Sequence, residues 1–157
     1  MFQAIIDELS NTFPEVPAQI AAVRLIAALT LGSIIGLERE RKGKPAGLRT
    51  NMLVALAACL FILVSQELAT MSFSNANVQL DPLRLIEAVT SGVAFLAAGI
   101  IFTSGGKVQN ITTGASLWLS GAIGLACGTG QIPLAAMATF IVVVVLFVIG
   151  HLEKRVN

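Results

Sequence analysis

The chain has 157 residues, of which 55% are hydrophobic and only 12% are charged, and its formal net charge is +1. A typical soluble domain carries about 25% charged residues, so this composition excludes a soluble enzyme and predicts an all-α integral membrane protein. The small net charge excludes a nucleic-acid partner, which a basic surface would attract. Cys59 and Cys127 lie in apolar runs away from other metal-ligating side chains, so we expect no cofactor and no resident metal.

The N-terminal segment, residues 1–16, has apolar side chains at helical spacing but is too short and too polar to span a bilayer. We expect it to form an amphipathic helix along the membrane surface or against the bundle. A spanning helix needs about 20 mostly apolar residues, and the rest of the chain predicts about five of them within one transmembrane domain, 17–152. The predicted spans are 17–37, 50–68, 82–102, 112–127 and 133–152, and residues 153–157 form a short tail.

Basic residues occur in only three of the segments outside the spans. These are the first connection, the third connection and the tail, which contain Arg39, Arg41, Lys42, Lys44, Arg49, Lys107, Lys154 and Arg155. With five spans, all three segments fall on one side of the membrane. Because cytoplasmic loops are enriched in Lys and Arg, the N-terminus is predicted outside and the C-terminus in the cytoplasm.

Small residues in the spans indicate where helices approach one another closely. Gly32 and Gly36 form a GxxxG step, as do Gly124 and Gly128, and such steps let backbones pack in lipid. The full set expected at helix contacts is Gly32, Gly36, Gly92, Gly99, Gly124 and Gly128. Two interpretations stay open, namely packing within one chain and self-association as a homodimer.

Two ionisable residues lie deep inside the predicted spans, away from their ends. Arg24 is seven residues past Pro17, and Glu87 is five residues past Pro82, which places them roughly 10 Å and 8 Å from the outer end of their helices at 1.5 Å per residue. An unpaired charge at such a depth is costly, so we expect Arg24 and Glu87 to pair, with Arg84 as a competitor for the carboxylate.

This polar group is interpreted either as a structural lock between two spans or as an ion or proton site that uses Glu87. A magnesium site would need several carboxylates at one depth. Asp81, at the outer rim, is the nearest candidate to join Glu87.

The first connection is the densest polar feature of the sequence. Glu38 lies where a helix ends and Arg49 where the next begins, and each charge opposes the dipole of its own helix. A contact between Glu38 and Arg49 across the hairpin would cancel both penalties, and Thr50 can cap the second span. The third connection contains Gly105-Gly106 beside Lys107, which indicates a tight turn because the phosphate-loop pattern is incomplete.

Three motifs in order carry a family resemblance. Gly36-Leu-Glu38-Arg39 followed by residues 46–50, which include Gly47, Arg49 and Thr50, resembles the first signature of the MgtC/SapB family of bacterial inner-membrane proteins. Residues 92–101 resemble the second signature, with Ala97 where a Gly is usual. Residues 111–118 with 122–126 resemble the third. Together these motifs cover about residues 20–150.

The resemblance implies a five-helix protein of the bacterial inner membrane. Family members are linked to growth at low magnesium and to survival inside macrophages, and one is thought to restrain the proton-translocating ATP synthase. This chain ends just after the fifth predicted span, where other members continue into a soluble domain, so we expect a short form. The first hypothesis for function is a non-enzymatic regulator of a partner membrane complex, and the alternative is a cation transporter or channel, with magnesium as the candidate ion.

Overall fold

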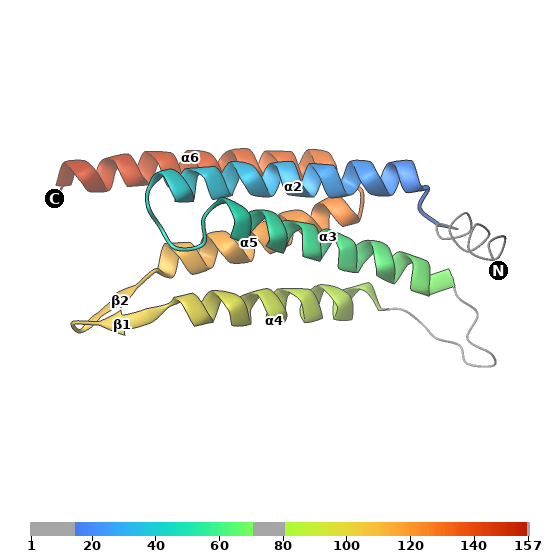
Figure 1. Cartoon of the computed structure of the whole chain (residues 1–157), viewed down its shortest axis with the longest axis horizontal. Coiled ribbons are helices and arrows are strands. Elements are labelled where there is room, and N and C mark those ends of the chain that lie inside the picture. Colours follow the sequence, from blue (N-terminus) through green and yellow to red (C-terminus); the bar gives the residue numbers. More distant parts are fainter. Residues whose placement is uncertain (1–14, 71–80, 157) are drawn as a thin grey trace, which may run out of the picture.

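A computed structural model of the chain describes residues 15–70 and 81–156. Its described part is an elongated bundle of helices that run roughly parallel to one long axis (Figure 1). In chain order the elements are α2 (Ala18–Arg41), α3 (Leu48–Thr70), α4 (Pro82–Ile100), β1 (Phe102–Ser104), β2 (Lys107–Gln109), α5 (Ile111–Gly128) and α6 (Ile132–Val156). The predicted all-α class is confirmed, with one two-stranded hairpin added. The predicted amphipathic helix falls almost entirely outside the described residues.

Each predicted span corresponds to one helix, but several ends differ. α2 continues to Arg41, beyond the predicted end at 37, and α6 continues to Val156. Most of the predicted tail is therefore the last turn of α6. α4 begins at Pro82, and the side chain of Asp81 caps it by accepting a hydrogen bond of 2.9 Å from the backbone N–H of Leu83.

The third connection is an antiparallel β-hairpin with a two-residue turn. Phe102 pairs with Gln109 and Ser104 with Lys107, which leaves Gly105 and Gly106 as the turn. Both glycines have positive φ, 59° and 75°, as a type I′ turn requires. The predicted tight turn is confirmed, and only the short strands that flank it were not predicted.

Four helices of the described part are long and apolar enough to cross a membrane, namely α2, α3, α4 and α5. In α6 the apolar stretch among the described side chains is Ile132–Val148. The chain is therefore a multi-pass membrane protein.

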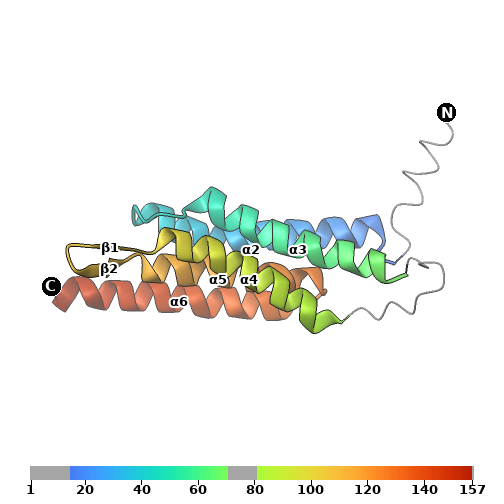
Figure 2. The same ribbon diagram turned by 90° about the horizontal axis from the view of Figure 1, so that it is seen from below.

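The centre of the bundle is α5, the shortest of the predicted spans. It packs against α2, α3, α4 and α6, and Figure 2 shows it enclosed among them. Its mean hydropathy, 1.3, is the lowest of the four long apolar helices, because it contains Gly114, Ser116, Ser120, Gly121 and Gly124, and all five are buried. A helix that contacts other helices rather than lipid needs small and hydroxylated side chains more than large apolar ones, which explains the low hydropathy of α5.

The connections fall at two ends of the bundle. The α2–α3 connection, the β1–β2 hairpin and the end of α6 lie together at one end, and the α5–α6 turn lies at the other (Figure 1). All the basic connections recognised in the sequence therefore gather at the same end, which we call the basic end.

Candidate functional site

The basic end of the bundle contains a buried arginine. Arg39 is only 3% exposed, and its guanidinium donates a hydrogen bond from Nη2 to the hydroxyl of Thr113 on α5. Its Nε has no hydrogen-bond partner among the described residues. Arg39 is therefore a buried cation that joins α2 to α5. The sequence alone indicated neither its burial nor its contact with Thr113.

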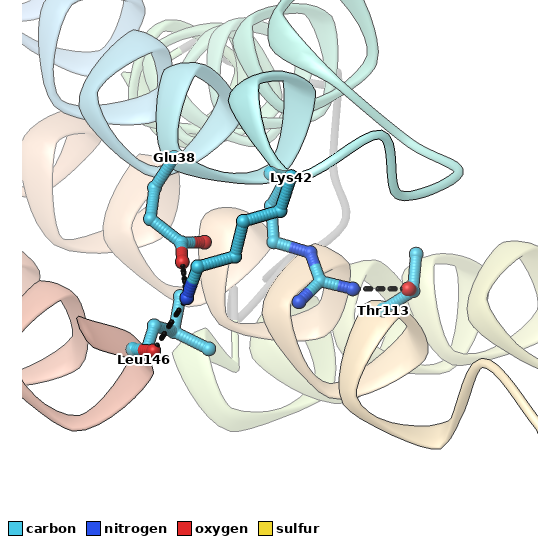
Figure 3. A network of polar contacts seen from close by, with 5 residues as sticks. Glu38, Lys42, Thr113 and Leu146 are labelled. Carbon is cyan, nitrogen blue, oxygen red and sulfur yellow. Dashed lines mark hydrogen bonds and ion pairs between the residues drawn. The ribbon is translucent and has the colours of Figure 1, made fainter. Parts of the chain in front are cut away.

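Glu38 and Lys42 form a second contact beside it, between α2 and α6. Figure 3 shows both side chains extending from α2 toward Leu146. Lys42 Nζ makes an ion pair with Glu38 Oε1 and donates a 2.8 Å hydrogen bond to the carbonyl oxygen of Leu146. The Glu38 carboxylate accepts no hydrogen bond within residues 15–70 and 81–156. Lys42 is its ion-pair partner, and the buried cation Arg39 also interacts electrostatically with it.

The expected contact between Glu38 and Arg49 is therefore wrong. Glu38 faces α6, while the carboxylate that crosses the hairpin is Glu40, whose Oε2 accepts a 2.7 Å hydrogen bond from the backbone N–H of Leu48. Residues two positions apart on a helix point to different faces, and Glu40 lies on the face that meets the start of α3. A β-carbon at Gly47 would lie only 2.7 Å from Glu40 Oε2, so glycine makes room for this cap.

An asparagine that was not among the predicted site residues connects the hairpin to the core. Asn51 is fully buried, and its Nδ2 donates to the carbonyl oxygens of Ala46 at 2.7 Å and Gly47 at 2.9 Å. Ser120 on α5 donates from its hydroxyl to Asn51 Oδ1 at 2.8 Å. The available signal in the sequence was an asparagine near the start of one span and a serine in the middle of another. Thr50, the expected cap, is exposed within the first turn of α3.

Arg24 does not pair with Glu87. Its Nη1 donates to Gln66 Oε1 at 3.1 Å and to the carbonyl oxygen of Gly128 at 2.8 Å. α3 and α5 lie between α2 and α4 (Figure 1), so similar depth did not bring the two charges together. Arg84 does not bind Glu87 either, since its Nε lies 4.0 Å from Asp81 Oδ2 at the exposed start of α4.

A stability measurement distinguishes these pairings. We expect Arg24→Met and Gln66→Leu to be coupled in a double-mutant cycle by about 1 kcal/mol, because neighbours in one hydrogen-bonded group are not additive. Arg24→Met and Glu87→Gln should be additive, because the two residues share no partner. Unfolding by SDS titration in mixed micelles measures both cycles, and coupling of Arg24 to Glu87 instead would contradict the arrangement described.

Glu87 itself is exposed on the outer surface of α4. No described residue forms an ion pair with it, and its backbone carbonyl accepts a hydrogen bond from the hydroxyl of Thr90 on the same helix. No group of three or more His, Cys, Asp or Glu side chains comes together within the described part of the chain. The bundle interior there holds no carboxylate set at one depth that could bind a divalent cation.

The glycines divide into two groups. Four glycines lie where another helix or the α2–α3 connection contacts the helix backbone, namely Gly32, Gly36, Gly124 and Gly128. A β-carbon at Gly128 would lie 2.6 Å from Ile62 Cβ, and one at Gly124 would overlap the backbone carbonyl of Ala55. Gly92 and Gly99 on α4 instead face open space. The GxxxG steps are therefore contacts within one chain, and the two α4 glycines are not.

A groove separates α3 from α4, which touch each other far less than either touches α5. Its volume is about 700 Å³, and its walls are α3 between Arg49 and Phe61 and α4 between Leu85 and Leu96. Arg49 and Thr50, at the basic end, are its only polar lining residues in the described part of the chain. We call this feature the α3/α4 groove.

Comparison with known proteins places these features in a family context. Residues 25–155 match the MgtC family. Protein MgtC of Salmonella typhimurium strain LT2 is 38% identical over 135 residues, which cover 86% of this chain and 54% of that protein. Protein MgtC of Brucella abortus strain 2308 is 40% identical over 129 residues, covering 82% and 51% respectively. The chain thus spans about half the length of these relatives, and no solved structure matches it.

Proposed function

Because this chain belongs to the MgtC family, we propose that it is a non-enzymatic regulator that binds another complex of the bacterial inner membrane, in cells limited for magnesium or under stress. In this proposal the basic end faces the cytoplasm, as the distribution of Lys and Arg favours. The N-terminus is then outside. The name of the relatives points to magnesium. The regulatory activity proposed for this chain is supported by the position of Glu87 and by the polar contacts inside the bundle.

The observation that carries the proposal is the position of Glu87. It lies about 8 Å along α4 from Pro82 at 1.5 Å per residue, on a surface that the rest of the described chain leaves uncovered. An ionisable side chain that faces lipid without a partner costs several kcal/mol and marks a functional site by default. A partner helix that offers a hydrogen-bond donor or a cation at this depth would offset that cost.

The interior of the bundle favours binding over transport. Four buried polar side chains join helices to one another: Arg39 binds Thr113, and Ser120 binds Asn51. Arg24 is occupied by Gln66 and a backbone carbonyl. A magnesium path would require several oxygen ligands at one level, which the described residues do not bring together.

The test is co-purification from native membranes with the Glu87→Gln variant. We expect a companion complex to be recovered with the wild-type chain and about tenfold less with the variant, which corresponds to a loss of about 1.4 kcal/mol of binding free energy. The same variant should fail to restore growth at low magnesium in a strain that lacks the protein. Glu15→Gln, which changes another exposed carboxylate, should behave as wild type.

The alternative function makes the opposite prediction. A cation transporter reconstituted alone in liposomes would carry ions without any companion, and Glu87→Gln would abolish that flux. Such flux, together with no companion complex in native membranes, would reject the regulatory function in favour of transport.

A further inference from the structure

The α3/α4 groove is a feature of the fold that the proposed function does not use. It is open on the side of the bundle, and apart from Arg49 and Thr50 its lining is aliphatic or aromatic. In a membrane such a surface is covered by something apolar. Its dimensions and its one charged end indicate what that is.

The length of the groove corresponds to one leaflet of the bilayer. Along α3 it runs from Arg49 to Phe61, twelve steps of 1.5 Å or about 18 Å. Along α4 it runs from Leu96 to Leu85, eleven steps or about 17 Å. The hydrocarbon core is about 30 Å thick, so both walls of the groove are much shorter than the core. A transmembrane helix from another protein would need a surface along the whole core, whereas the acyl chain of a lipid needs only one leaflet.

The charge at the open end favours an anionic headgroup. Arg49 is exposed and forms no ion pair with any residue in the described part of the chain. The carboxylate nearest to this helix start, Glu40, accepts the N–H of Leu48 instead. An arginine guanidinium presents paired N–H donors that match a phosphate group, and the hydroxyl of Thr50 adjoins it in the groove lining.

We propose that the α3/α4 groove binds an anionic phospholipid of the inner leaflet, with one acyl chain along the groove and the phosphate on Arg49 and Thr50. The acyl chain covers the apolar walls between α3 and α4. The headgroup supplies the negative charge that Arg49 lacks within the described protein. The proposal goes beyond the regulatory function and does not depend on Glu87.

Native mass spectrometry of the full chain in a non-ionic detergent tests the proposal with two probes that share the same acyl chains. We expect phosphatidylglycerol to bind about tenfold more tightly than phosphatidylcholine, because the choline cation already neutralises the phosphate of the latter. Arg49→Gln should remove most of this preference. Arg41→Gln is the matched control, because Arg41 is an exposed cation of the same hairpin that does not line the groove, and it should keep the preference.

A second pair of variants tests the apolar part of the site. Gly92 lines the groove and has open space where a β-carbon would lie, so Gly92→Leu should fold and should reduce the binding of both lipids. Gly99→Leu adds the same side chain to open space outside the groove and should leave binding unchanged. The proposal is overturned by equal binding of the two lipids, by an equal loss in Arg49→Gln and Arg41→Gln, or by a Gly92→Leu effect on dimer mass rather than on lipid binding.

Discussion

Replacing Gly124 with alanine is expected to lower the free energy of unfolding by about 3 kcal/mol, at the upper end of the usual range for overpacked cores. The added methyl group would overlap the backbone carbonyl of Ala55 on α3. A side chain can rotate away from such a clash, but a helix backbone can relieve it only if α5 and α3 move apart. That movement would disturb the hydrogen bond between Ser120 and Asn51 as well, since it joins the same two helices.

The control is the same substitution at Gly99. This glycine also lies in a helix, but a methyl group added to it would have nothing within 4 Å. Gly99→Ala should therefore be neutral or stabilising by up to about 1 kcal/mol through helix propensity. Unfolding of both variants in mixed detergent micelles gives the comparison. Equal stabilities would show that α3 and α5 are not in backbone contact at Gly124.

A similarly large loss is expected when Lys42 is replaced by methionine. Lys42 is the ion-pair partner of the Glu38 carboxylate, which accepts no hydrogen bond among the described residues. Removing one partner of a buried pair typically costs 3–5 kcal/mol, because the other charge is left uncompensated. We expect about 3 kcal/mol here, the low end of that range, because the Lys42 side chain remains 29% exposed.

Two further variants show whether the cost comes from the orphaned carboxylate. Glu38→Gln combined with Lys42→Met should recover part of the lost stability, because the carboxylate that lost its ion-pair partner is removed. The recovery is partial because the buried cation Arg39 then loses the negative charge of Glu38. Arg41→Met removes an exposed cation from the same turn and should change stability by less than about 0.5 kcal/mol. If Lys42→Met lowered the free energy of unfolding no more than Arg41→Met does, the ion pair would contribute nothing to the packing of α2 against α6.

The sequence was sufficient to predict the helices, since a span of about 20 apolar residues is a local property of the chain. Hydropathy located all five described helices, and two adjacent glycines located the turn of the hairpin. Which helix lies at the centre was not local information. Taken alone, the low hydropathy of α5 indicates a weak span. Once its neighbours are known, the same composition is that of a helix surrounded by protein.

The sequence by itself determined that the chain is a multi-pass helical membrane protein with its basic connections at one end. It also selected charged residues as site candidates, among them Arg24, Glu38, Arg39, Arg49 and Glu87. Only the tertiary structure decided their partners. Depth along a helix follows from residue number, but the direction in which a side chain points depends on which helices are neighbours. Arg24 and Glu87 are at similar depths, yet α3 and α5 stand between their helices. Glu38 faces α6, and Arg49 lines one end of the α3/α4 groove instead of pairing with it. The packing around α5 sets which face of each helix is covered.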